Sequence, residues 1–171
     1  KLKACIPGGS SVPILPAHLL LKTAKGETRY MNYESLSDGG FESGSMLGSG
    51  GFIVLDESQC IVRHTMSLAR FYNHESCGQC SPCREGTGWM YRILKRLENG
   101  EGELSDIDLL YDIQRRIEGN TICPLGDAAA WPVAAAIRHF REEFEWHVTH
   151  RDECLQRNFG MAPVAESLAL S

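Results

Sequence analysis

The sequence has no long apolar run and no excess of basic charge, and each absence excludes a class of protein. No stretch approaches the roughly 20 consecutive apolar residues that a membrane-spanning helix needs. The 17 Lys and Arg residues are outnumbered by 22 Asp and Glu residues, and the basic side chains are scattered among the acidic ones. A protein that binds nucleic acid normally gathers basic side chains in a patch. We therefore expect no membrane span and no nucleic-acid partner.

The first residues also lack the pattern of a secretory signal. The segment KLKACIPGG has neither the apolar stretch nor the cleavage site of such a signal. We expect a reducing, cytosol-like compartment, where the seven cysteines are not disulfide staples and clustered spacing favours a metal or redox site. The chain starts at Lys1, without Met and directly on a strand-like segment, so we expect it to be part of a longer protein.

Residues 1–60 show the composition and turn signals of β-strands. LKACI and SVPIL flank the turn-forming PGGSS, and GFIVLDE follows a glycine-rich segment. Between them, HLLLKTAKGETRYMNY predicts a hairpin with Lys25 and Gly26 at its tip. We expect no helix in this part of the chain.

Four amphipathic helices are predicted after about residue 61, where the apolar period changes. The first ends before a cysteine-rich loop, and the second follows the loop and stops at Asn99-Gly100. The third has Ser105 as its N-cap and ends at Gly119, and the fourth begins at Pro132. Four such helices with short connections favour a small bundle.

The densest chemical signal is HESCGQCSPCREG, in which Cys77, Cys80 and Cys83 recur every three positions. Cys123, followed by Pro124, lies far along the chain, between the third and fourth predicted helices. The spacing C-x2-C-x2-C is typical of bacterial ferredoxins, where a remote cysteine completes the ligand set. The sequence therefore predicts one 4Fe-4S cluster on these four cysteines.

The residues between the cysteines suit an anionic cluster. Gly78 and its small neighbours allow the loop to curl and to aim backbone N–H groups at sulfur, while Pro82 limits the loop's freedom. The positive end of the helix after Cys83 and the guanidinium of Arg84 add favourable charge nearby.

A zinc-stapled interaction domain is the alternative interpretation. In that case the triplet binds zinc with a histidine, and Cys123 is a buried small hydrophobic residue. Structural zinc sites usually combine one C-x2-C pair with a second, distant pair, so the consecutive triplet favours the iron-sulfur interpretation.

The remaining cysteine and histidine residues are assigned no site. His147 and His150 lie one helical turn apart with Cys154 nearby, but a solvated helix end explains them better than a metal does. Cys5 and Cys60 lie in or beside predicted strands and are interpreted as packed thiols.

Three segments, ESCGQCSPCREGTGWM, GNTICPLGDAAAWPV and IRHFREEFE, resemble the NADH-binding flavoprotein (the F subunit) of respiratory complex I, NADH-quinone oxidoreductase. The resemblance implies an α+β fold and three parts of the chain. Residues 1–60 resemble the C-terminal part of a β-grasp domain of the soluble ligand-binding type, 61–150 a helical 4Fe-4S-binding domain with a four-helix bundle, and 151–171 a C-terminal tail.

The resemblance also implies a path for electrons. The cluster takes electrons singly from FMN, which has accepted a hydride from NADH, and passes them to further iron-sulfur subunits. The family's flavin and NADH domain has no counterpart in this sequence, so FMN and NAD are expected on an upstream domain.

The partners implied are that domain of the same subunit, a thioredoxin-like 2Fe-2S subunit and a multi-cluster iron-sulfur subunit. The location implied is cytoplasmic and peripheral on the inner face of the membrane, or the matrix side in a mitochondrion. The same architecture also serves soluble NAD-reducing hydrogenases and formate dehydrogenases, which remain an alternative.

Overall fold

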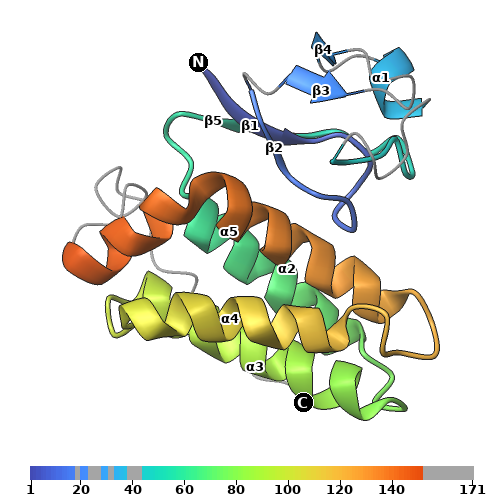
Figure 1. Ribbon diagram of the computed structural model, residues 1–171. Helices are drawn as coiled ribbons and strands as arrows, with labels where there is room; N and C mark the ends of the chain where they lie inside the picture. Colours follow the sequence, from blue (N-terminus) through green and yellow to red (C-terminus); the bar gives the residue numbers. More distant parts are fainter. Residues whose placement is uncertain (18–19, 23–27, 31–32, 38–43, 152–171) are drawn as a thin grey trace.

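The computed structural model describes residues 1–17, 20–22, 28–30, 33–37 and 44–151, in which a small sheet lies against four long helices (Figure 1). Strand β1 (Leu2–Ile6) is the centre of a three-stranded sheet. It pairs antiparallel with β2 (Leu15–Pro16) on one side and with β5 (Ile53–Asp56) on the other. The first and last strands therefore agree with the sequence patterns, whereas most of the predicted SVPIL strand lies outside β2.

A second, two-stranded sheet confirms the predicted hairpin. Strands β3 (Leu20–Lys22) and β4 (Thr28–Tyr30) are antiparallel, with Lys22 opposite Thr28. The predicted tip at Lys25 and Gly26 lies outside the described residues. The expectation that this part of the chain has no helix is wrong, because α1 (Tyr33–Ser37) follows the hairpin. A helix of so few residues is too short to show a helical period in the sequence.

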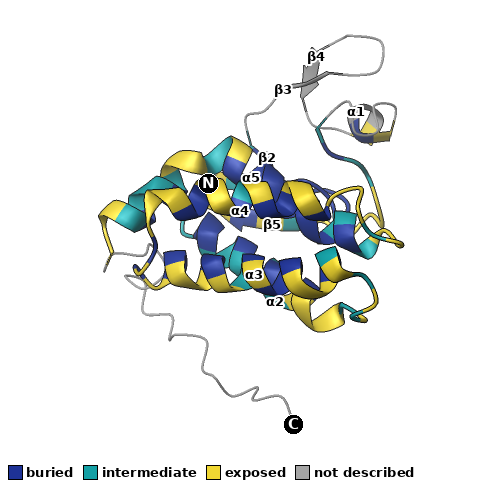
Figure 2. Cartoon of the chain, turned by 60° about the horizontal axis from the view of Figure 1, so that its bottom comes forward, coloured by how far each residue is buried: buried dark blue, intermediate teal, exposed yellow. Residues whose placement is uncertain are grey.

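The four long helices pack together, with their buried faces turned inward (Figure 2). They are α2 (Ile61–Glu75), α3 (Ser81–Glu98), α4 (Leu104–Ile117) and α5 (Leu125–Thr149). None of the helices in the described part of the chain combines the length and apolar character that crossing a membrane requires. The predicted tail falls almost wholly on residues 152–171, which lie outside the described residues.

The boundaries of α2 and α3 agree with the sequence signals. Cys60 is the N-cap of α2, and its sulfur accepts a hydrogen bond from the Arg63 N–H at 3.4 Å. Helix α3 ends at the C-cap Asn99, after which Gly100 adopts a φ of +77°. Glycine takes that left-handed conformation without the steric cost of a Cβ atom.

The predicted starts of the last two helices are wrong. Helix α4 is capped by Glu103 instead of Ser105, because Glu103 forms a capping box with Asp106, whose Oδ2 accepts the Glu103 N–H at 2.9 Å. Helix α5 begins well before Pro132, directly after its N-cap Pro124. Pro132 removes one backbone donor inside the helix, and the alanine-rich segment around it has high helix propensity.

The sheet and the helices share one hydrophobic core. Ile6 and Ile14 from the sheet region belong to the same buried cluster as Leu94, Leu110 and Phe144 from three of the helices. An ion pair of 2.8 Å between Lys3 Nζ on β1 and Glu143 Oε2 on α5 adds a polar link between the layers. The sheet is therefore packed on the bundle, and the cysteine loop lies at one end of the bundle.

Candidate iron-sulfur centre

Three of the four candidate cysteines surround the beginning of α3. Cys77 is exposed, Cys80 is half-buried and is the N-cap of α3, and Cys83 is buried in the first helical turn. Gly78 makes this turn possible, because its φ of +77° reverses the chain between α2 and α3. Pro82 occupies the first turn of α3, where a missing N–H leaves no hydrogen bond unmade.

The fourth candidate meets the triplet through the loop between α4 and α5. The backbone N–H of Ile122 donates a hydrogen bond to Cys80 Sγ at 3.3 Å, across 42 positions of sequence. Cys123 is the next residue and is exposed. The Thr121 hydroxyl donates to the Cys123 carbonyl oxygen at 2.9 Å, which braces the loop. The fold therefore brings the loop of the fourth cysteine against the loop of the other three.

Polar groups around the sulfurs favour negative charge there. Besides the Ile122 N–H, the Ser76 hydroxyl lies 3.1 Å from Cys83 Sγ. The N-terminal end of α3 adds the positive end of its helix dipole beside Cys80. Hydrogen-bond donors and partial positive charge of this kind stabilise thiolates and the anionic groups that thiolates hold.

Arg84 lies at the cysteine loop, and its guanidinium contacts the backbone of that loop. Its Nη1 donates to the Gly78 carbonyl oxygen at 2.8 Å, and its Nε donates to Glu85 Oε1 at 3.0 Å. The guanidinium is thus occupied by loop contacts and by a carboxylate of opposite charge. Its main effect is to hold the turn at Gly78 in place, which positions Cys77 and Cys80.

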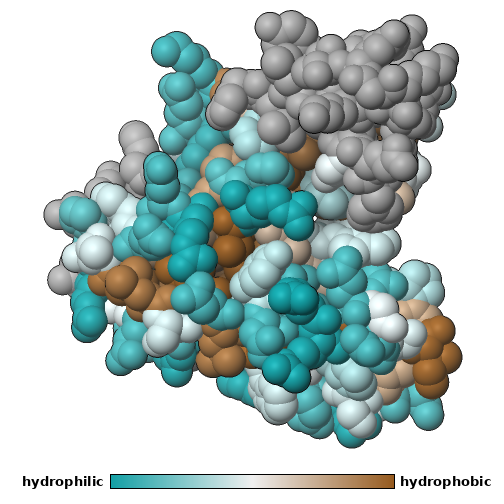
Figure 3. All heavy atoms as spheres, viewed as in Figure 1, coloured by the Kyte–Doolittle hydropathy of each residue, from teal (hydrophilic) through white to brown (hydrophobic). Residues whose placement is uncertain are grey.

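The side chains present fit an iron-sulfur cluster in their chemistry. Thiolates are the soft ligands that select iron-sulfur clusters, zinc or Cu(I). Cys77 and Cys123 are exposed, so the site is open toward solvent. Ile122 is 83% exposed, and Figure 3 shows hydrophobic surface at the edge of the molecule where the α4–α5 loop runs. A hydrophobic side chain next to two candidate ligands would limit the access of water once a partner covers it.

Sequence reasoning missed two polar contacts to the cysteine sulfurs, from Ile122 and Ser76, and a buried polar group elsewhere. Ile122 and Ser76 have no sequence signal beyond their position next to a candidate cysteine. The interpretation of His147 as part of a solvated helix end is wrong, because His147 is buried and lies 3.1 Å from Cys60 Sγ. Cys60 is buried, as expected for a packed thiol.

Comparison with known proteins identifies the helical region. Residues 63–147 match the family model described as the NADH-ubiquinone oxidoreductase-F iron-sulfur binding region. The F subunit of NADH-quinone oxidoreductase from Rickettsia bellii (strain OSU 85-389) is 54% identical over 144 residues, which are 84% of this chain and 32% of that protein. The F subunit from Rhodobacter capsulatus is 48% identical over 150 residues, which are 88% of this chain and 32% of that protein. The chain thus spans about a third of the length of these relatives.

Solved structures support the same assignment. An air-oxidized NAD⁺-reducing [NiFe]-hydrogenase superimposes with a TM-score of 0.69 at 27% identity, over 86% of this chain and 24% of that chain. The H2-reduced form gives the same TM-score of 0.69 at 24% identity, which shows the fold alone. With the family match and the F-subunit relatives, these similarities show that the chain carries the iron-sulfur binding region of the NADH-ubiquinone oxidoreductase-F family and belongs to that family.

Proposed function

We propose that this chain is the electron-transfer part of an NADH dehydrogenase flavoprotein, in which Cys77, Cys80, Cys83 and Cys123 hold one 4Fe-4S cluster. The observation that carries the proposal is the hydrogen bond from the Ile122 N–H to Cys80 Sγ, which joins the two cysteine-bearing loops. The match of residues 63–147 to an iron-sulfur binding region supports the identity of the group.

A 4Fe-4S cluster at this site would supply one chemical property, the uptake and release of single electrons. The residues of this chain tune that property through their contacts with the cysteine sulfurs. The Ile122 N–H and the Ser76 hydroxyl stabilise negative charge on the sulfurs, and the end of α3 adds positive potential. These contacts favour the reduced, more negative state, so they raise the reduction potential.

The wider assignment follows the F-subunit relatives. An upstream domain of the same subunit would bind FMN and NAD and would supply the hydride chemistry, and the four cysteines of this chain would hold the group that takes up the electrons singly. A thioredoxin-like 2Fe-2S subunit and a multi-cluster iron-sulfur subunit are the further partners. The assembly is peripheral on the inner face of the membrane, on the cytoplasmic side or on the matrix side of a mitochondrion.

The division of the chain into parts belongs to the same proposal. Residues 1–60 are the C-terminal part of a β-grasp domain, which the antiparallel sheet of β2, β1 and β5 supports. Residues 61–150 are the 4Fe-4S-binding domain, and residues 151–171 are a tail. The boundary between the first two parts coincides with Cys60, the N-cap of α2.

A second candidate is the same module in a soluble NAD-reducing hydrogenase or formate dehydrogenase. The superposition on the NAD⁺-reducing hydrogenase favours it. The identity of 54% to an F subunit, against 27% to that hydrogenase, favours the respiratory enzyme. Co-purification distinguishes them: quinone-linked iron-sulfur subunits support the main proposal, and a nickel-containing or molybdenum- or tungsten-containing subunit supports the alternative.

Metal analysis tests the cluster directly. Anaerobically purified chain is expected to be brown and to contain about four irons and about four acid-labile sulfides. The measurement is iron and sulfide content per chain, together with zinc in the same sample. One sulfide-free zinc ion bound by the four cysteines would contradict the proposal and would favour the zinc-stapled domain.

Ile122 offers a finer test, because the group that donates to Cys80 is its backbone N–H. Ile122→Pro removes the N–H, whereas Ile122→Ala removes the exposed side chain and keeps the N–H. A hydrogen bond that is about 1 kcal/mol stronger in the reduced than in the oxidised cluster raises the potential by roughly 40 mV for one electron. We expect the midpoint potential of the proline variant to fall by about that amount relative to the alanine variant. Equal potentials in the two variants would show that the N–H does not tune the cluster.

A further inference from the structure

A buried group of three potential metal ligands lies at the far end of the bundle from the cysteine loop. It consists of Cys60, Glu98 and His147, called the buried triad below. Cys60 precedes α2, Glu98 is the last residue of α3, and His147 is in the last turn of α5. The cysteine loop instead joins the end of α2 to the start of α3. The two sites therefore lie at opposite ends of the bundle (Figure 1).

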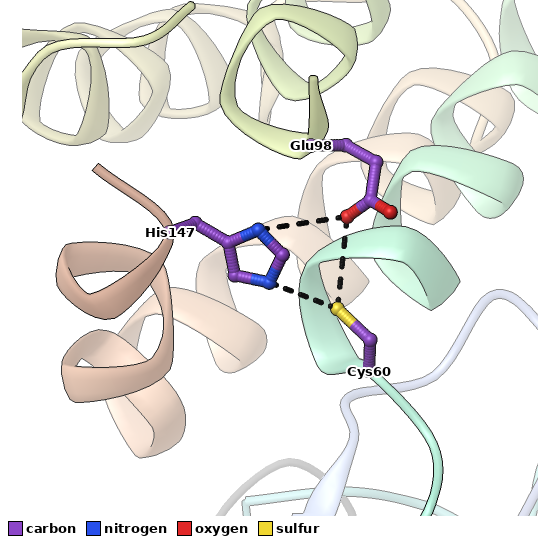
Figure 4. A group of neighbouring side chains, drawn as sticks. All are labelled: Cys60, Glu98 and His147. Carbon is purple, nitrogen blue, oxygen red and sulfur yellow. Dashed lines mark hydrogen bonds and ion pairs between the residues drawn. The ribbon is translucent and has the colours of Figure 1, made fainter. Parts of the chain in front are cut away.

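The three side chains point toward one another (Figure 4). Cys60 Sγ lies 3.1 Å from His147 Nε2 and 3.6 Å from Glu98 Oε2, and His147 Nδ1 lies 3.7 Å from Glu98 Oε2. Zinc binds sulfur at about 2.3 Å and nitrogen or oxygen at about 2.0–2.2 Å, so tetrahedral ligand atoms are about 3.3–3.7 Å apart. The 3.6 Å between the sulfur and the carboxylate oxygen falls in this range, and one ligand atom from each of the three residues lies within 4.8 Å of the other two.

The imidazole ring has to turn before one of its nitrogens can bind an ion together with the other two ligands. Its two nitrogens face different neighbours, Nε2 toward Cys60 and Nδ1 toward Glu98. Rotation of the ring about its Cβ–Cγ bond would direct one nitrogen between the sulfur and the carboxylate. The backbone positions of all three residues, at the ends of three packed helices, stay unchanged in this rotation.

Burial and charge also suit a cation. Cys60, Glu98 and His147 are 0%, 5% and 3% exposed, and a carboxylate so far from water needs compensating charge. Arg63 Nη1 lies 3.9 Å from Glu98 Oε1 and places a positive charge beside it. The charges of a divalent ion, one thiolate and one carboxylate sum to zero. The positive end of α2, which begins at Cys60, further favours a negative sulfur.

We propose that the buried triad binds one zinc-type divalent ion through Cys60 Sγ, a ring nitrogen of His147 and a carboxylate oxygen of Glu98, with water as the fourth ligand. A mixed set of sulfur, nitrogen and oxygen donors suits zinc, whereas magnesium and calcium prefer oxygen alone. The Cys60 S–H proton passes to solvent as the sulfur–metal bond forms, so binding tightens as the pH rises. The ion ties the ends of α2, α3 and α5.

The test uses chain whose iron-sulfur content has been measured, so that the four cysteines of the other centre are accounted for. Zinc is added to one equivalent, and excess is removed with a mild chelator. Wild type is expected to retain about one zinc per chain. X-ray absorption at the zinc edge should report one sulfur and two or three nitrogen or oxygen ligands.

Cys60→Ser and Cys5→Ala are a matched pair of variants. Serine keeps a side-chain acceptor at the N-cap of α2 but replaces the thiolate, and Cys5→Ala removes a buried thiol of β1. We expect Cys60→Ser to weaken zinc affinity by about 100-fold or more, and Cys5→Ala to leave it unchanged. Zinc should raise the melting temperature of wild type and of Cys5→Ala, but not of Cys60→Ser.

Three results would overturn the zinc site. They are the absence of retained zinc in wild type, equal zinc affinity in wild type and Cys60→Ser, and an absorption spectrum with four sulfur ligands. The first two would leave the triad as a hydrogen-bonded group and would not affect the iron-sulfur proposal. The third would place zinc on the other cysteines, and the iron content of the same sample would show whether that proposal fails too. Because the spectrum is recorded on wild type, the decision does not depend on a variant folding.

Discussion

Replacement of Cys123 with serine is expected to remove most of the bound cluster, with iron falling from about four per chain to below about one. Cys123 is the one candidate ligand that lies outside the triplet, on the loop between α4 and α5. Without it, the remaining three thiolates leave one iron without a cysteine ligand. The measurement is iron and sulfide content, together with the visible absorption of the anaerobic protein.

The same variant is expected to loosen the helices that the cluster joins. A metal group that connects two distant loops contributes to the folding free energy, because the unfolded chain does not offer a preformed site. Amide hydrogen exchange should therefore accelerate at the end of α2 and in α5 after Pro132. The proposal fails if exchange in these two segments and the iron content both match wild type.

Cys5→Ala is the matched control for this experiment. Cys5 is fully buried in β1, and burial raises the pKa of its thiol to about 11. The thiol is therefore protonated at neutral pH, and Cys5 lies outside the two loops that carry the four candidate ligands. Its removal should leave the iron and sulfide content unchanged, which separates the loss of a ligand from the loss of any cysteine.

Much of the arrangement around the cysteine loop can be predicted from local signals. The periodic apolar residues of α2 and α3, and the stop at Asn99-Gly100, depend only on neighbours in sequence, so a single sequence contains them. The triplet spacing identifies the residues, and the fold adds the contact between Ile122 and Cys80. That the four cysteines bind a cluster stays a prediction.

The two predicted helix starts are wrong because one residue with a strong positional preference draws the prediction away from weaker signals in its neighbours. Proline is common in a first helical turn, so Pro132 predicts a helix start. The structure instead begins α5 after Pro124, and the alanines on both sides of Pro132 continue the helix through it. Ser105 is likewise the better cap by residue type, although the side chains of Glu103 and Asp106 accept from each other's backbone N–H in a capping box.

The buried triad cannot be predicted from sequence. Glu98 and His147 are surrounded in sequence by charged residues, which normally indicate a solvated face. Their burial results from three helix ends meeting in space, at positions far apart along the chain. Single-sequence periodicity contains no information about such a meeting.

The glycine-rich residues 44–51 bear on whether this chain can bind NADH by itself. A dinucleotide fingerprint needs glycines that lead into a helix, whose N-terminus binds the pyrophosphate. Here the glycines lead into strand β5. A Cβ atom on Gly48 would lie 2.3 Å from the Gly8 carbonyl oxygen, so this glycine allows two backbone segments to approach closely. The segment is therefore a packing loop, as its irregular spacing indicates.

The chain alone, loaded with its cluster, is expected to show no reduced-cluster signal with NADH and a full signal with a strong chemical reductant. NADH delivers a hydride, which carries two electrons, whereas a 4Fe-4S cluster accepts electrons singly, so a flavin must mediate between them. The measurement is electron paramagnetic resonance of the same sample after each addition, with Cys123→Ser as the control that lacks the signal. Addition of the flavin-bearing domain should restore reduction by NADH. Rapid reduction by NADH without that domain would contradict the proposed division of labour and would point to a nucleotide site within residues 1–60.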